Sequence, residues 1–203
     1  MKVVICILCV AVLMASAQTP SGGLSTQDRN ALLDELAKTK QEFIASIRGL
    51  TDEQWRFKPS PFRWSVAQCA EHIILSEDFP FGLSQAQLKL PAQSRSQETR
   101  AQIDQGVTAR LADRSQKGSA PPPLGPKGKF ATPAEAIAEF TARRDRIIAY
   151  VKTTSDDLRG HFPSDNPRAL DAYQYILLEA RHSARHTVQI REVESDAHYP
   201  AAH

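Results

Sequence analysis

The chain has 203 residues, a length typical of one domain with its own hydrophobic core. Its 25 lysines and arginines nearly balance 23 aspartates and glutamates, so the kind of basic surface that binds nucleic acid is not expected. Two small basic clusters, TARRDR and GPKGK, are expected to form an exposed helix face and a loop.

The first 17 residues have the pattern of a cleavable secretory signal peptide. Lys2 supplies a positive start, residues 3–14 form an uncharged apolar run, and the stretch at 15–17 is a cleavage site of the A-x-A type. The apolar run is too short to span a bilayer comfortably, so an uncleaved anchor is the less favoured alternative. A lipoprotein signal is also disfavoured, because Leu8 rather than a small residue precedes Cys9.

Export would place the mature protein in the periplasm or in the medium. A short flexible N-terminus is then expected at 18–24, a single domain at 25–196 and a tail at 197–203. Cleavage removes two of the three cysteines and leaves Cys69 alone. The mature monomer therefore has no internal disulfide and depends on packing for its stability.

Four long segments have helical periodicity, and we find no strand-like alternation of any length. The first segment, 26–48, carries apolar residues at spacings of three, four and seven. A short turn of helix follows in TDEQW, with Thr51 as its cap and Gln54 reaching back. The second long helix opens at Ser65, where Gln68 completes a capping box.

The end of the second helix depends on Pro80, because a proline removes one backbone donor and crowds the preceding turn. The helix either ends near Leu75 or continues, kinked, to about Leu88. The residues at 91–131 then form a long connection, with a minor helix near 97–112 and an extended, proline-rich remainder. A connection of this length is often functional or wraps the surface.

The third long helix starts in TPAEAIAEF, with Thr132 as its cap and Pro133 in its first turn, and continues to about Thr153. The fourth begins after SDNP, with Pro167 near its first turn, and continues to about Ser195. Four long helices without strands predict an all-α fold, a four-helix bundle with a long connection between helices two and three.

His182 and His186 lie one turn apart on the fourth helix, beside its apolar face. Two imidazoles at this spacing can bind one metal ion at about 2.1 Å. A third ligand must come from another helix, and the second helix offers His72. Spacing alone leaves open both a metal site and ordinary polar histidines. The remaining histidines lie in predicted loops or in the tail: His161, His198 and His203.

Glu179 lies one turn before His182 and is the candidate catalytic residue, either as a base or by orienting a ligand. Ser183 follows His182, so the glutamate of the H-E-x-x-H peptidases is absent. Cys69 lies one turn before His72 and is either a fourth metal ligand or, more commonly for such a residue, a small buried thiol.

Several other residues have two readings. Trp55 and Trp64 flank the loop before the second helix and either line a pocket mouth or pin that loop to the end of the bundle. Tyr175 is either a hydrogen-bond donor to a metal-bound group or a core residue with its hydroxyl at the rim. Glu71 and Glu77 are offset from the stripe of the helix-two histidine, so we expect them at the surface or as outer partners of the site.

The stretch LTDEQWRFKPSPFRWSVAQCAEHIILSE resembles the signature of the DinB/YfiT-like superfamily. The connection APPPLGPKGKFATPAEAIAEF and the stretch LLEARHSARHTVQI are similar to later landmarks of that family, so the resemblance covers about 26–195. It implies an up-down-down-up bundle with a divalent metal ion, often nickel or zinc, held by three histidines. Carried over to this sequence, His72 matches the ligand on helix two, and His182 and His186 match the pair on helix four.

Some members of the family are thiol-dependent transferases or isomerases, and others are described as metal-dependent hydrolases. Export weakens the thiol-based reading, because low-molecular-weight thiols are scarce outside the cytoplasm. Three histidines leave coordination positions open, which favours a metal-dependent hydrolase or transferase. The alternative is a non-enzymatic bundle with a structural or sensing metal, which a ligand from Cys69 or Glu179 would favour.

The expected partner is a small-molecule substrate whose identity the sequence does not define. Nucleic acid is not expected as a partner, and neither is a stable membrane anchor after cleavage. A homodimer is left open.

Overall fold

The computed structural model describes residues 23–116 and 118–201, and over these residues the chain forms helices and one isolated bridge between Ala92 and His161. The predicted signal peptide lies outside the described residues, and so does most of the N-terminal segment expected to be flexible. None of the described helices is long and apolar enough to cross a bilayer. The helices are α1 (Thr26–Ile47), α2 (Asp52–Arg56), α3 (Val66–Ser76), α4 (Asp78–Gln87), α5 (Gln97–Ala112), the 3₁₀ turn η1 (Pro122–Leu124), α6 (Pro133–Thr153) and α7 (Ala172–Glu194).

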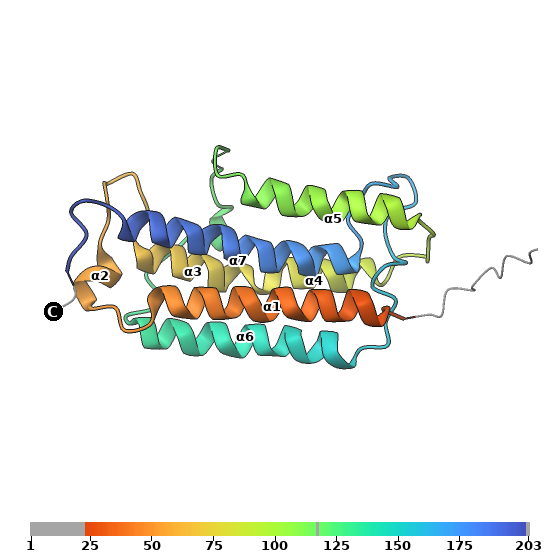
Figure 1. Ribbon diagram of the computed structural model, residues 1–203, viewed down its shortest axis with the longest axis horizontal. Coiled ribbons are helices and arrows are strands. Elements are labelled where there is room, and N and C mark those ends of the chain that lie inside the picture. The colour runs from red at the N-terminus through yellow and green to blue at the C-terminus, as the bar shows by residue number, and fades with distance from the viewer. Residues whose placement is uncertain (1–22, 117, 202–203) are drawn as a thin grey trace, which may run out of the picture.

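The fold is the predicted four-helix bundle, made by α1, the continuous path of α3 and α4, α6, and α7 (Figure 1). In that view α1 and α7 run in one direction, and α3–α4 and α6 run in the other. The long connection makes this order possible, because α5 returns the chain along the outside of α7 before α6 begins. The second and third bundle helices therefore run parallel, whereas a short loop would have made them antiparallel.

The second bundle helix does not end near Leu75 but continues beyond Pro80 with a break in its hydrogen bonding, as in the kinked alternative. Its first part, α3, ends at Ser76, four residues before Pro80, at the carbonyl that a proline ring would crowd. The N–H of Glu77 then bonds three residues back, to the carbonyl of Ile74 (3.3 Å), and α4 continues to Gln87. Pro80 itself is buried within α4. The proline therefore breaks the hydrogen-bond ladder without ending the helical path.

The predicted start of the fourth bundle helix near Pro167 is wrong by about five residues. The helix α7 begins at Ala172, where the Asp171 carboxylate accepts the N–H of Gln174 and the Gln174 side chain bonds back to Asp171. This reciprocal cap satisfies the backbone N–H groups of Asp171 and Gln174, whereas a proline side chain has no acceptor for a backbone N–H. The other predicted caps are confirmed: Ser65 and Thr51 both form complete capping boxes.

The core has two apolar halves with a polar layer between them. Along α1, Leu36 belongs to one half and Phe43 to the other, and the buried Thr39 lies between them. Along α6, Ile147 and Phe140 are divided in the same way by the buried Arg144.

We call this polar layer the Arg144 network. The guanidinium donates to both carboxylate oxygens of Glu77 (2.7 and 2.9 Å), to Glu179 (2.7 Å) and to Ser183 (2.8 Å). It also donates to Thr39 (2.7 Å) and to the carbonyl of Leu36 (3.1 Å). Arg144 belongs to the basic TARRDR cluster, so the prediction of an exposed helix face is wrong for this residue. All three of its nitrogens have partners, which is what a buried cation requires.

Candidate metal centre

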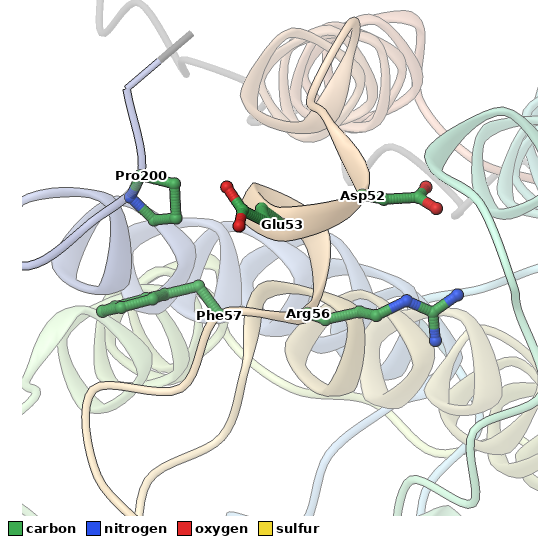
Figure 2. A pocket seen from close by; sticks show the side chains of 5 residues that line it. All are labelled: Asp52, Glu53, Arg56, Phe57 and Pro200. Carbon is green, nitrogen blue, oxygen red and sulfur yellow. The ribbon is translucent and has the colours of Figure 1, made fainter.

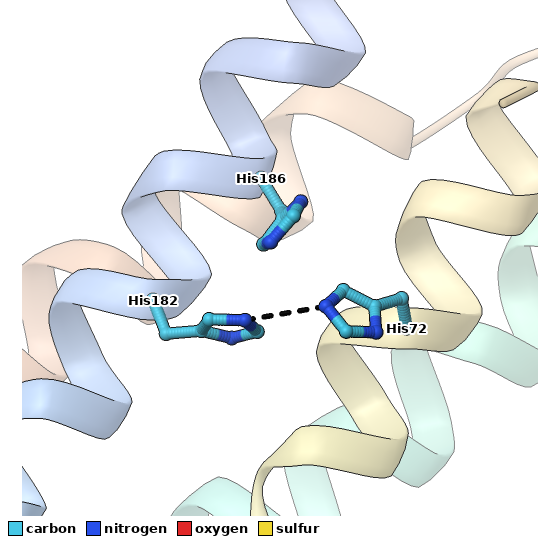
Figure 3. Close-up of side chains that lie close together, drawn as sticks. All are labelled: His72, His182 and His186. Atoms are coloured by element: carbon cyan, nitrogen blue, oxygen red, sulfur yellow. Dashed lines mark hydrogen bonds between the residues drawn. The ribbon is translucent and has the colours of Figure 1, made fainter. Parts of the chain in front are cut away.

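Three histidine side chains converge between α3 and α7 (Figure 3). His72 extends from α3, and His182 and His186 extend from successive turns of α7. Each offers a ring nitrogen, and the three nitrogens lie within 4.8 Å of one another. The Nε2 atoms of His72 and His182 are 3.2 Å apart. The structure thus brings together the three residues selected from the sequence.

The spacing of these nitrogens suits a common divalent ion. Two nitrogens bound at about 2.1 Å in neighbouring positions of a tetrahedral or octahedral ion are separated by about 3.0–3.4 Å. The separation between His72 and His182 falls in this range. Imidazole is also the ligand that zinc and nickel accept readily. We call the group the histidine cluster, and its residues fit a divalent ion.

Hydrogen bonds to the outer ring nitrogens fix the orientation of two rings. The Nδ1 atom of His72 lies 2.8 Å from the carbonyl oxygen of Leu124, and a carbonyl can only accept, so this nitrogen carries the proton. The Nδ1 atom of His186 lies 2.8 Å from the Gln189 side-chain oxygen in the same way. Both rings therefore present an unprotonated Nε2 to the centre, which is how metal-binding histidines are commonly prepared.

The histidine cluster is neutral at ordinary pH. Burial lowers the pKa of His72, although the hydrogen bond to Leu124 acts in the opposite direction. Burial lowers the pKa of His182 well below 6.5, and repulsion from the other two imidazoles adds to the effect. The pKa of His186 falls to about 3, mainly through burial and then through its proximity to His72. Unprotonated nitrogens are the form that binds a metal ion.

Trp64 covers one side of the histidine cluster. Its ring centre lies 5.0 Å from that of His72 and 6.1 Å from that of His186. Trp55 does not line the site: it is fully buried, and its indole N–H donates to the carbonyl of Phe130 (3.4 Å), which ties the connection between α5 and α6, rather than the loop before α3, to the bundle. One tryptophan thus lines the site and the other belongs to the core.

Of the two predictions for Cys69, the small buried thiol is the one that the structure supports. Its side chain is fully buried in the apolar half of the core, and burial raises the pKa of the thiol to about 12. It does not belong to the histidine cluster, and within the described residues no other cysteine, aspartate or glutamate does. The cluster therefore offers three ligands and leaves further coordination positions free. Solvent can reach its edge, since His182 and His186 are partly exposed.

The Glu179 carboxylate is bound to Arg144 in the Arg144 network rather than to a histidine. Its role in catalysis stays a prediction. Burial raises the pKa of Glu179 well above its ordinary value, although Arg144 acts against this. Of the two alternatives for Glu71 and Glu77, the surface one is wrong, because both residues are buried. Glu77 pairs with Arg144 and Glu71 binds the connection between α5 and α6.

The other two histidines of the described residues lie apart from the histidine cluster. His161 bonds through Nδ1 to the carbonyl of Leu90 (2.7 Å), and His198 is exposed beside Asp196. Tyr175 is half-buried on α7. These placements agree with the choice of His72 over the loop histidines.

Two surface hollows lie away from the histidines. One, of about 390 Å³, is at the end of the bundle beside α2 (Figure 2) and is lined by Asp52, Glu53, Arg56, Phe57 and Pro200. The second, of about 180 Å³, lies between α5 and α7 and includes Arg114, Arg181 and Arg185. Neither hollow is lined by a histidine.

Comparisons with known proteins agree with this architecture. The chain is 23% identical over 149 residues to the uncharacterized protein YuaE of Bacillus subtilis (strain 168), covering 73% of this chain and 88% of that protein. Its fold is similar to that of YfiT from Bacillus subtilis, described as a probable metal-dependent hydrolase with an unusual four-helix bundle topology. That similarity has a TM-score of 0.54 at 18% identity and covers 87% of this chain and 91% of YfiT. Residues 24–190 match the family model of the DinB superfamily. The chain therefore belongs to the DinB superfamily.

Proposed function

We propose that this protein binds one divalent ion, zinc or nickel, through His72, His182 and His186 and uses it in hydrolysis or group transfer on a small molecule. The observation that carries the proposal is the convergence of three neutral imidazoles, two of them oriented by hydrogen bonds at Nδ1. YfiT, similar in fold, is itself described as a probable metal-dependent hydrolase.

When bound, the ion would supply Lewis acidity to polarise a carbonyl or activate a nucleophile. The chain supplies the rest of the site. His72 and His186 keep their Nε2 atoms directed at the centre through Leu124 and Gln189. Trp64 covers one side and excludes water there. The three-ligand set leaves room for a substrate atom.

Hydrolysis is the preferred chemistry of the two. We also propose that the protein is exported after cleavage behind Ala17, since the first 17 residues have the pattern of a signal peptide. Thiol cosubstrates would then be scarce, which disfavours thiol transfer. N-terminal sequencing of the mature protein should begin at Gln18. Full-length chain recovered from the cytoplasm would contradict export and leave the metal proposal unaffected.

Elemental analysis of protein purified without an affinity tag tests the metal site. Wild type should contain about one divalent ion per chain after loading, and His72→Ala, His182→Ala and His186→Ala should each reduce this towards zero. The matched control is His161→Ala, whose ring bonds to Leu90 outside the cluster and should leave the metal content unchanged. A wild type that retains neither zinc nor nickel contradicts the proposal.

Turnover separates the enzymatic role from a structural one. The loaded protein should hydrolyse a member of an ester, amide or thiol-conjugate library, and His182→Ala should abolish that activity. A metal ion that raises the melting temperature but supports no turnover in any of the libraries would favour a structural or sensing ion instead.

A further inference from the structure

Two consecutive residues of α3 bind the same short piece of the connection. His72 bonds through Nδ1 to the carbonyl of Leu124 (2.8 Å). The carboxylate of its neighbour Glu71 accepts three backbone N–H groups, from Lys127 (2.8 Å), Gly128 (2.7 Å) and Lys129 (3.2 Å). The segment 124–129 is thus tied to α3 at both of its ends.

The Glu71 carboxylate is buried, and among residues 23–116 and 118–201 it pairs with no arginine or lysine side chain; backbone donors bind it instead. Only 3% of the residue is exposed, and burying such a charge is tolerated when several N–H groups converge on it. The convergence depends on the turn at Gly128, whose φ of +79° lies in the left-handed region. The conformation of the turn therefore allows its three N–H groups to reach the carboxylate.

The 3₁₀ turn η1 also restrains the start of this segment. Leu124 ends the 3₁₀ turn η1, which begins with two consecutive prolines, and the N–H of Gly125 bonds to the carbonyl of Pro122 (3.4 Å). Prolines restrict the backbone angles, so the direction of the Leu124 carbonyl is set by η1 before it and by the turn bound to Glu71 after it. That carbonyl is the acceptor that selects the protonated nitrogen of His72.

We propose that Glu71 is a positioning residue for the metal site. It holds the turn at 127–129 so that the Leu124 carbonyl meets the Nδ1–H of His72, which keeps Nε2 free to bind the ion. The inference rests on the proposed role of His72 as a ligand. Because coupling between two sites is reciprocal, an ion bound at His72 also stabilises the segment 124–129.

A residue that only stabilised the fold would lower the melting temperature and leave the metal affinity of the folded protein unchanged. The positioning role predicts a change in affinity. Glu71→Gln is the sharp variant, because it preserves shape but replaces one acceptor oxygen with an NH₂ group facing backbone donors. The matched control is Glu135→Gln, because the Glu135 carboxylate accepts the Ala131 N–H (2.9 Å) at the end of the same connection and does not belong to the histidine cluster.

Zinc affinity is measured by competition with a chromophoric chelator on folded protein. Glu71→Gln should bind zinc about 10–100-fold more weakly than wild type, the usual effect of losing an outer partner, and Glu135→Gln should match wild type. The ¹⁵N spectrum of the imidazoles gives a second readout: His72 should be protonated at Nδ1 in wild type and populate both tautomers in Glu71→Gln. A structural role alone would not produce this shift.

Gly128→Ala disrupts the turn without changing Glu71. A Cβ there meets no atom within 4 Å, so the substitution acts through backbone strain alone. It should weaken zinc binding in the same direction, and it replaces Glu71→Gln as the test if that variant does not fold. Zinc should also slow tryptic cleavage after Lys127 and Lys129 in wild type, and do so less in both variants.

The outcomes separate the two proposals. If wild type binds no metal, the proposed function fails. If wild type binds zinc and both Glu71→Gln and Gly128→Ala bind it equally well, the metal site stands and the positioning role of Glu71 is overturned.

Discussion

The Arg144 network and the histidine cluster are neighbouring polar groups of one bundle, and they meet their bonding requirements in opposite ways. On α7 the two sets alternate, since Glu179 and Ser183 belong to the first and His182 and His186 to the second. Every nitrogen of the Arg144 guanidinium faces an oxygen acceptor.

In the histidine cluster, two ring nitrogens face each other at 3.2 Å, and no carboxylate of the described residues belongs to the group. At that distance one of the two nitrogens carries the N–H of a neutral imidazole and donates it to the other, unless both bind a cation. The Arg144 guanidinium finds all of its acceptors within the chain and serves stability. The histidine cluster instead offers ring nitrogens with lone pairs, which under the proposed function bind a divalent ion.

The largest expected effect is on the Arg144 network. Arg144→Met removes the cation and leaves Glu77 and Glu179 buried together, so the free energy of unfolding should fall by about 3–5 kcal/mol in a urea titration of metal-free protein. The neighbouring Arg143→Met is the control, because the ion pairs of Arg143 with Asp78 and Glu139 are partly exposed and should contribute about 0–1 kcal/mol. Equal losses would show that the network is no more important than a surface pair.

A smaller effect is expected from pH, and it should come from the histidine cluster. The folded-state pKa values of the three histidines lie below the unfolded value of about 6.5, so the unfolded chain binds more protons as pH falls from about 6.5 towards 3. The unfolding free energy of the metal-free protein should therefore decrease, by on the order of 2 kcal/mol between pH 7.5 and pH 6.

The same titration on a variant with alanine at His72, His182 and His186 isolates the contribution of the cluster. The variant should lose much of the pH dependence, because its remaining titrating groups are shared with wild type. Parallel curves for the two proteins would mean that the three imidazoles are not held neutral by burial. In the metal-loaded protein, the same protonation should release the ion below about pH 6.

The smallest effect is expected at Cys69, which tests whether the cluster has a fourth ligand. Cys69→Ala should leave the metal content unchanged and cost about 1 kcal/mol, the range for removing a small buried group. Loss of the ion would add the thiol to the cluster and favour a closed, structural site. Slow reaction of the native thiol with Ellman's reagent would agree with its burial and raised pKa.

The sequence predicted the bundle and the histidines because both depend on positions along a helix. Spacing determines which residues share a face, so His182 and His186 could be paired, and the capping boxes at Thr51 and Ser65 located two helix starts. The same spacing could have revealed Arg144, which continues the buried stripe of Phe140 and Ile147 on α6. Its charge favoured a prediction of surface exposure. The two carboxylates that compensate this charge come from other parts of the chain, so spacing along α6 does not reveal them.

Spacing along one helix does not predict the path of the chain outside the helices. The bond between His72 and Leu124 joins residues 52 positions apart, and Glu71 binds a turn in the same distant segment. The start of α7 was misplaced for a related reason: Pro167 is a common first-turn residue, but the Asp171 and Gln174 cap satisfies more backbone donors.

Because α7 follows the other described helices in the sequence, its synthesis determines when the core of the bundle can close. This helix packs against α1, α3, α4 and α5, so the bundle has no finished interior until the last long helix has been synthesised. Its partner α1 is the first of the described helices to be made, and contacts so distant in sequence close slowly. Two of the three histidines are also on α7. A nascent chain stalled before residue 172 would consequently lack both a closed core and two of the three residues of the proposed metal site.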